Sequence, residues 1–226
     1  LDLNTGDIMS SWNSTFRPAG IMRHNHENNS LFLKGKEIIN FDMNLGESKW
    51  IIERNTFNSI NNFGIGNTGF IGGRLYKDDF NFCICIYTVD LVSGSEPELV
   101  TCPKYSLEEA TANGFYGNIS NITPFIENGD TLLFVGFDDS YSPLSEGFWG
   151  IYNLTQDEWE VEKVLCEERN RLGGIGYSIH YYEERFYFSS GKSIQCWDRN
   201  TYEMLWKKEF SNTFGSGTRL VEEHNV

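Results

Sequence analysis

A hairpin motif that recurs along the chain constrains its fold more than any other feature of the sequence. In each copy an apolar segment ends in Asp or Asn, a short turn follows, and the next segment usually carries a Trp. Asp, Asn, Thr and Gly favour tight turns, because the polar side chains bond to the backbone and Gly accepts positive φ. The flanking segments alternate apolar and polar residues, as strands do. The copies are Leu1–Trp12, Phe41–Trp50, Val89–Val100, Tyr152–Trp159 and Trp197–Trp206.

The spacing of the copies is that of propeller blades. The Asp or Asn before the turn stands at positions 2, 42, 90, 153 and 198, which are 40, 48, 63 and 45 residues apart. Repeats of about 40 to 50 residues are typical of four-stranded propeller blades, so the longest interval indicates an insertion. We expect two more strands before each later hairpin, and the segments that fit are Ala19–Asn25, Ser30–Lys36, Ser59–Gly66, Gly69–Tyr76, Asn121–Glu127, Thr131–Phe137, Ile175–Tyr182 and Arg185–Ser189.

The two ends of the chain predict a shared closing blade. The chain begins inside a hairpin that supplies two outer strands, and Gly217–Asn225 has the pattern of one inner strand. Together they would complete a fifth blade and remove exposed sheet edges. We therefore predict an all-β protein, with residues 1–226 forming a single β-propeller domain of about five four-stranded blades. The stretch from position 198 round to position 2 holds only 30 residues, so one strand of this blade is expected to be missing or to precede Leu1.

The hairpin resembles the repeat of the quinoprotein-alcohol-dehydrogenase-like propellers, in which Asp, Thr-Gly and Trp mark each blade. The matching segments are Asp2-Leu3-Asn4-Thr5-Gly6 and Asp42-Met43-Asn44-Leu45-Gly46-Glu47 with Trp50. This resemblance implies the fold. Catalytic members of that family carry more blades and hold a quinone with a calcium ion, but their cofactor ligands have no recognisable counterpart here. The resemblance therefore implies a non-catalytic member without a cofactor.

The charge of the chain limits the classes of partner. Acidic residues outnumber basic residues by 32 to 18, which gives a net charge of −14. Such a chain repels phosphate backbones, so we expect no nucleic-acid partner. The sequence has no apolar run near the roughly 18 residues of a membrane helix, so we expect no membrane partner either. The charge either keeps the protein soluble or steers a basic protein toward it, and both interpretations stay open.

The number and spacing of the cysteines indicate the compartment in which the protein works. They are odd in number and form no CxxC pair, whereas a disulfide framework usually has an even count at close spacing. We therefore expect reduced, packed thiols, which favour the cytoplasm. An N-terminus processed before Leu1 would leave a secreted or periplasmic location open. The five cysteines are Cys83, Cys85, Cys102, Cys166 and Cys196.

Two patterns could carry cofactor or metal chemistry, and each has a simpler explanation. Residues 64–69 read GxGxxG, but a dinucleotide site needs a helix after this motif, and Phe70–Leu75 has the pattern of a strand. His24 and His26 could begin a metal site, but a third ligand at a clear spacing is not visible. The nucleophile motif GxSxG is also absent from the sequence. We expect no catalytic, cofactor or metal site.

Paired carboxylates keep one enzymatic alternative open. A glycosidase needs two carboxylates at a set separation across a cleft, and acidic pairs such as Asp138-Asp139 and Glu167-Glu168 are available. Adjacent acidic residues more often mark a solvated loop. A carbohydrate-binding or glycosidase-like propeller is therefore the alternative function.

The candidate binding site lies in long loops on one face of the predicted ring. Loops between blades, and loops between the second and third strands of a blade, emerge on the same face, and here they span residues 55–61, 103–117, 137–147 and 166–174. Long loops on a rigid scaffold commonly bind partners. Aromatic anchors within a charged rim are typical of tight protein interfaces, although the aromatic side chains could instead fill the centre of the ring. The predicted partner-binding residues are Tyr105, Glu108, Glu109, Tyr116, Asp138, Asp139, Tyr141, Glu167 and Glu168.

These observations favour a monomeric, non-enzymatic propeller that binds a basic protein through its acidic loop face. A more specific version of this hypothesis is an immunity-type inhibitor that covers a cationic toxin or nuclease. Both the net charge and the missing catalytic signatures are consistent with it.

Overall fold

The computed structural model describes residues 23–25, 30–34, 37–53, 66–76, 82–102, 118–138, 146–169, 175–190 and 193–211. Fifteen β-strands and no helix occur among these residues, which confirms the all-β class. In this part of the chain we find no helix that could span a membrane.

The strands form four antiparallel sheets, and in each sheet the spatial order of the strands follows the sequence. Sheet 1 contains β1 (Arg23–Asn25), β2 (Ser30–Lys34), β3 (Glu37–Asp42) and β4 (Glu47–Glu53). Sheet 2 contains β5 (Thr68–Tyr76), β6 (Phe82–Asp90) and β7 (Glu98–Thr101). Sheet 3 contains β8 (Asn118–Glu127), β9 (Asp130–Asp138), β10 (Glu146–Asn153) and β11 (Glu158–Arg169). Sheet 4 contains β12 (Ile175–Tyr182), β13 (Arg185–Ser190), β14 (Ser193–Asp198) and β15 (Met204–Glu209).

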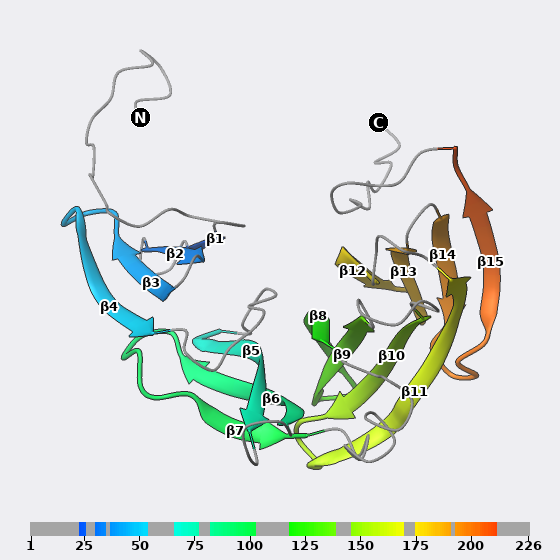
Figure 1. Ribbon diagram of the computed structural model, residues 1–226, viewed down its shortest axis with the longest axis horizontal. Helices are drawn as coiled ribbons and strands as arrows, with labels where there is room; N and C mark the ends of the chain where they lie inside the picture. Colours follow the sequence, from blue (N-terminus) through cyan, green and yellow to red (C-terminus); the bar gives the residue numbers. More distant parts are fainter. Residues whose placement is uncertain are drawn as a thin grey trace.

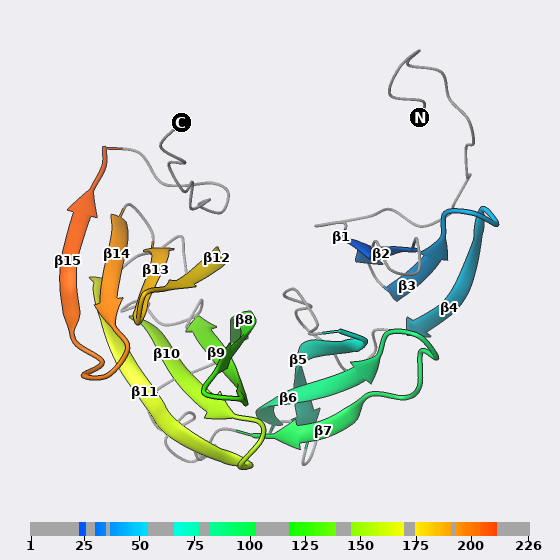
Figure 2. The same cartoon turned by 180° about the vertical axis from the view of Figure 1, so that it is seen from behind.

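The four sheets follow one another along an arc, as consecutive blades of a propeller do (Figures 1 and 2). The outermost strands are β4, β7, β11 and β15, and β8 of sheet 3 contacts both β5 and β12 on the inner side. Sheets 1 and 4 stand at the two ends of the arc. The predicted closing blade depends on residues 1–22 and 212–226, which lie outside the described residues.

The four later copies of the motif are confirmed as the outer hairpin of each sheet, from β3–β4 to β14–β15. The inner strands of sheets 3 and 4 lie where the alternation predicted them. For sheet 1, the described part of the expected strand Ala19–Asn25 is β1 alone. For sheet 2, the expected strand Ser59–Gly66 lies outside the described residues except for Gly66, which is in a turn. The strand expected after the GxGxxG pattern is confirmed as β5.

Alternation of side chains along the strands builds a separate core on each face of sheet 3. On β9, Leu132 and Phe134 are buried against sheet 4, whereas Leu133 and Val135 are buried against sheet 2. Successive side chains of a strand point to opposite faces, so one apolar strand serves two interfaces. Trp149 of sheet 3 belongs to the core shared with sheet 4 and is fully buried. Its ring stacks on that of Phe134, with the ring centroids 5.0 Å apart.

Two of the three motif tryptophans in the described residues pack between sheets, and the third is exposed. Trp50 packs on the core between sheets 1 and 2, and Trp159 packs on the core between sheets 2 and 3. Trp206 differs, because it lies on sheet 4 at one end of the arc and is 46% exposed.

The four described hairpin turns share the same two hydrogen bonds, from backbone N–H groups to the side chain of the Asp or Asn before the turn. In the β3–β4 turn, Asp42 Oδ1 accepts hydrogen bonds from the N–H groups of Asn44 and Leu45 at 2.7 and 3.1 Å. The same two bonds recur at Asp90, Asn153 and Asp198. This is the physical reason that Asp or Asn precedes every turn.

The fifth residue of every described turn, four after the Asp or Asn, has positive φ. Gly46 and Gly94 take this place with φ of 72° and 65°, and Asp157 and Tyr202 take it with φ of 58° and 57°. Glycine adopts such angles without strain, whereas other residues do so at a cost. In sheets 3 and 4 the residue with positive φ is not glycine, and its side chain forms a hydrogen bond. Asp157 accepts one from Tyr152, and Tyr202 accepts one from Arg199.

The turn bonds predict an acid-sensitive contribution to stability. Backbone N–H groups lower the pKa of Asp90 and Asp198 below the ordinary value of 3.8. A carboxyl whose pKa is lower in the folded state stabilises the fold above its ordinary pKa, and this stabilisation is lost as the pH falls below it. Asn153 shows that Asn makes the same turn bonds without a charge.

We therefore expect Asp90→Asn with Asp198→Asn to keep the fold at neutral pH and to reduce the decline of Tm between about pH 4 and pH 2. Thermal unfolding monitored by circular dichroism across this range measures the effect. Glu183→Gln, at an exposed carboxylate, is the control and should not change the decline. An acid limb that is the same in the Asn variant and the parent would contradict the prediction.

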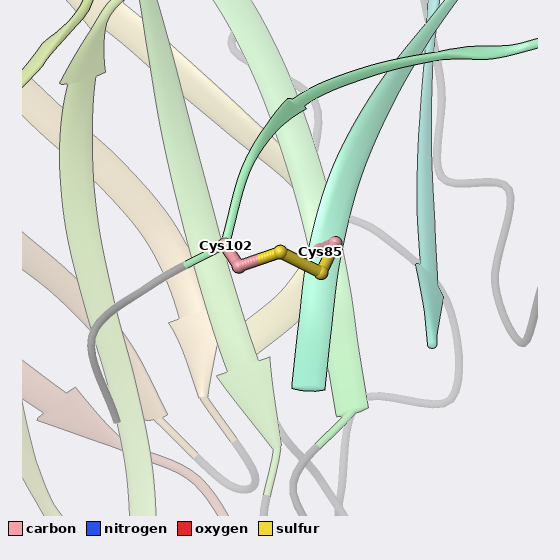
Figure 3. Close-up of a disulfide and its surroundings, with 2 residues drawn as sticks. All are labelled: Cys85 and Cys102. Atoms are coloured by element: carbon pink, nitrogen blue, oxygen red, sulfur yellow. A yellow bond between two sulfur atoms is a disulfide. The ribbon is translucent and has the colours of Figure 1, made fainter. Parts of the chain in front are cut away.

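Two cysteines correct the expectation of reduced thiols. Cys85 and Cys102 form a disulfide with Cα atoms 4.1 Å apart (Figure 3). They are 17 residues apart in sequence, but the β6–β7 hairpin pairs Ile86 with Thr101 and so brings the flanking cysteines together. Spacing along the chain could not indicate this pair. The expectation is confirmed for Cys196, which is free and buried.

Candidate partner-binding surfaces

Three of the predicted acidic residues lie at one end of sheet 3. Asp138 is the last residue of β9 and pairs with Gly147 of β10, which in turn pairs with Cys166 of β11. The next β10 pair joins Glu146 to Arg169, so Glu167 and Glu168 form a bulge beside it. The register therefore brings Asp138, Glu167 and Glu168 to the same edge, which we name the loop end of sheet 3.

The structure places two of these residues in a strand and not in the predicted loop. Glu167 and Glu168 belong to strand β11, which continues to Arg169, and not to a loop beginning at Cys166. The bulge explains the error, because two adjacent charged residues break the alternation by which a strand is recognised. The remaining predicted residues lie outside the described residues: Tyr105, Glu108, Glu109, Tyr116, Asp139 and Tyr141.

The opposite end of sheets 3 and 4, which we name the turn end, carries a buried arginine that the sequence reasoning missed. Arg199 lies in the β14–β15 turn and is 6% exposed. Its Nη2 donates to Glu127 Oε2 of β8 at 2.7 Å and to Glu160 Oε2 of β11 at 2.6 Å. One guanidinium of sheet 4 thus holds two carboxylates of sheet 3, and it fixes the two sheets to each other at this end.

Two tyrosines complete this cluster. Arg199 Nη1 donates to the Tyr202 hydroxyl at 2.9 Å, and the Tyr181 hydroxyl donates to Glu127. Burial would lower the pKa of Arg199, but the ion pairs with Glu160 and Glu127 outweigh it and raise the pKa. Burial and the bond to Glu127 raise the pKa of Tyr181 to about 12. At neutral pH the arginine is therefore charged and both tyrosines are protonated donors.

The turn end also carries many acidic side chains of sheets 3 and 4. Beyond the two glutamates that bind Arg199, it carries exposed carboxylates on the turns and outer strands of sheets 3 and 4, and among the described residues Arg185 is an exposed cation there. The acidic residues at this end are Glu127, Asp130, Asp157, Glu158, Glu160, Glu183, Glu184, Asp198 and Glu203. The sequence reasoning placed the acidic binding surface at the loop end, and the turn end is a second acidic surface.

Within the described ranges, no three His, Cys, Asp or Glu side chains are placed to hold a metal ion. Glu127 and Glu160 both accept hydrogen bonds from Arg199. His24 lies on β1, and the expected partner His26 lies outside the described residues.

One sequence signal could have pointed to the arginine cluster. In the last copy, Asp198-Arg199-Asn200-Thr201-Tyr202, a tyrosine replaces the glycine that three other copies carry at this position. A bulky residue at a position of positive φ indicates a compensating contact. Tyr202 contacts Arg199. The carboxylate partners of Arg199 are 39 and 72 residues away from it, so the sequence alone could not identify them.

No protein-family model and no curated protein matches the chain. Similar solved structures include BamB from Moraxella catarrhalis, with 12% identity and a TM-score of 0.42 over 83% of this chain and 52% of that one. The WD40 domain of SCAP from fission yeast has 10% identity and a TM-score of 0.39, over 84% of this chain and 42% of that one. The AfRom2 CNH domain has 13% identity and a TM-score of 0.35, over 85% of this chain and 71% of that one. The chain spans about half the length of the first two, and because every TM-score is below 0.5, the architecture rests on the four sheets themselves.

Proposed function

We propose that the chain is a five-bladed, non-enzymatic β-propeller that binds a basic protein. The fifth blade is formed by the N-terminal hairpin and a C-terminal strand, which close the ring between sheets 1 and 4. Four consecutive sheets and the match of residues 2–6 to the described turns support this closure. Closure would cover the two end sheets and give a monomer with no free blade face.

The observation that carries the binding proposal is the acidic charge together with its placement. The net charge is −14, and the strand register brings Asp138, Glu167 and Glu168 together at the loop end of sheet 3. Such a field steers a cationic protein and speeds its association. The specific form of the proposal is an immunity-type inhibitor that covers a cationic toxin or nuclease.

Two matched triple variants test which acidic surface binds. The loop-end variant carries Asp138→Asn, Glu167→Gln and Glu168→Gln, and the turn-end variant carries Glu158→Gln, Glu183→Gln and Glu203→Gln. Each variant removes three negative charges, so the two keep the same net charge. We expect the loop-end variant to associate with the basic partner about tenfold more slowly at about 0.05 M salt, and the difference to shrink at about 0.5 M.

The partner for this measurement is the basic protein that the immobilised chain retains from its own cells at low salt and releases at high salt. Surface plasmon resonance then gives the association rate for each variant. Equal slowing by both variants would mean that only net charge acts. Slowing by the turn-end variant alone would move the site to that face, and rates independent of salt would contradict a charge-steered partner.

We also propose that the protein works in an oxidising compartment. Disulfides persist in secreted and periplasmic proteins and are rare in the cytosol. The Cys85–Cys102 disulfide therefore favours the secreted or periplasmic location over the cytoplasmic one. Thiol labelling of the protein in intact cells tests this proposal, since Cys85 and Cys102 should resist alkylation until a reductant is added.

A further inference from the structure

Two segments of sheet 3 have the sequence that accepts N-linked glycans. The acceptor sequence is Asn-X-Ser/Thr, and in a secreted protein it is expected on an exposed loop. Asn121-Ile122-Thr123 lies on β8, and Asn153-Leu154-Thr155 begins at the last residue of β10. Burial of the two asparagines decides whether the folded protein can carry a glycan at either position.

The side-chain amide of Asn153 is enclosed and hydrogen-bonded at both ends. Asn153 is 3% exposed. Its Oδ1 accepts hydrogen bonds from the N–H groups of Thr155 and Gln156, both at 3.0 Å. Its Nδ2 is the atom to which a glycan would be attached, and it donates to Asp130 Oδ2 at 2.9 Å. A sugar on this nitrogen would need space that the packed protein does not leave.

The other two residues of this acceptor segment are bound to strand β9. The N–H group of Leu154 donates to the carbonyl oxygen of Thr131 at 2.9 Å. Thr155 Oγ1 accepts from the N–H group of Thr131, also at 2.9 Å. The segment is therefore fixed along its whole length in the folded protein. A glycan could be attached here only before the turn forms, and it would then prevent the turn from forming.

Asn121 is enclosed still more completely. It is fully buried on β8, and its Oδ1 accepts a hydrogen bond from the Thr123 hydroxyl at 2.8 Å. Its neighbour Ile122 is fully buried in the core that sheet 3 shares with sheet 2. A glycan on Asn121 would have to pass through this packed core, so a chain modified there could not complete sheet 3.

The disulfide and the buried acceptors together restrict the compartment in which the chain can fold. Disulfides form in the endoplasmic reticulum and in the bacterial periplasm. The endoplasmic reticulum also transfers glycans to Asn-X-Ser/Thr segments of chains that are still folding. We infer that this chain folds where cysteines are oxidised and N-glycans are not transferred, which describes the periplasm. The inference rests on the proposed oxidising compartment and narrows it to one of the two candidates.

Expression in two hosts tests the inference. One signal sequence directs the chain to the periplasm of a bacterium, and another directs it to the endoplasmic reticulum of a yeast. We expect folded protein from the periplasm. In the yeast we expect most of the chain to be retained, with glycans on Asn121 or Asn153 of the retained fraction, located by mass spectrometry of glycopeptides. The secreted fraction should carry neither glycan.

An exchange of two bonded residues separates the effect of the glycan from that of the host. Asp130→Asn with Asn153→Asp keeps the hydrogen bond and the net charge but removes the acceptor asparagine. An aspartate at position 153 accepts the two turn bonds as Asp90 does. We expect the exchange variant to be secreted severalfold better than the parent from the yeast, and to have the parent's Tm when both are made in the periplasm.

Glu209→Asn is the matched control for an exposed acceptor. This single change gives residues 209–211 the acceptor sequence, and the side chain of Glu209 is 73% exposed. Added to the exchange variant, it should be glycosylated at position 209 and should not reduce secretion. This result would show that the host modifies the chain and that the position of the glycan decides the outcome.

Two results would overturn the inference. One is a folded, secreted chain with a glycan on Asn121 or Asn153. The other is full secretion of the parent with both asparagines unmodified, because the endoplasmic reticulum would then suit the chain. Reduced Cys85 and Cys102 in intact cells would instead reject the proposed oxidising compartment, and capture of a basic protein tests the binding function separately from both.

Discussion

Replacing Arg199 by Ala is expected to lower the free energy of unfolding by about 3 kcal/mol, because it leaves two carboxylates facing each other without their cation. The guanidinium bonds to Glu127 and Glu160 at 2.7 and 2.6 Å, and its own side chain is 8% exposed. The two glutamate side chains are 19% and 26% exposed, so water reaches them in part. The expected loss therefore lies at the low end of the range for broken buried pairs.

Urea unfolding at neutral pH measures this loss, and two variants interpret it. Adding Glu127→Gln and Glu160→Gln to Arg199→Ala should recover most of the stability, because the like charges are then gone. Arg185→Ala, at an exposed arginine of the neighbouring strand, should leave the urea midpoint nearly unchanged. A triple variant as unstable as Arg199→Ala would show that the arginine acts through packing alone.

The parts of the fold that sequence could predict are those whose physics is local. Each turn Asp or Asn bonds to N–H groups two and three residues further on, and the positive φ occurs four residues on. A motif of five residues contains all of these interactions. The hairpins at Asp42, Asp90, Asn153 and Asp198 were therefore readable in the sequence, and the alternating segments beside them gave the inner strands.

The parts that escaped prediction depend on residues far apart in sequence. Arg199 meets carboxylates on β8 and β11, and neither position is marked by its neighbours. Glu167 and Glu168 were assigned to a loop because a bulge in β11 interrupts the alternation. The position of a tryptophan in the repeat likewise did not tell whether a neighbouring sheet covers it, and Trp206 is exposed where Trp50 is packed.

The disulfide lies in the sheet whose outer strand has the least other support. The second described hairpin has no Trp, with Leu99 half exposed near the tryptophan position, and β7 has four residues where β4 has seven. Cys102 follows β7 directly and is bonded to Cys85, which is fully buried in β6. The covalent bond therefore holds the end of the shortest outer strand in register.

Removing this bond should lower the free energy of unfolding by about 3 kcal/mol. The bond closes a loop of 17 residues, and without it the unfolded chain regains the entropy that this closure removes. Cys85→Ser with Cys102→Ser, or a reductant added to the parent, should lower Tm to a similar extent. The reductant should leave Tm of the double-Ser variant unchanged, since that variant lacks the Cys85–Cys102 bond that the reductant cleaves. Native-state hydrogen exchange should quicken first in β7, the strand that the bond secures.

A parent whose Tm and exchange are the same with and without reductant would show that β7 holds its place by backbone pairing alone. The argument for an oxidising compartment would then lose its support.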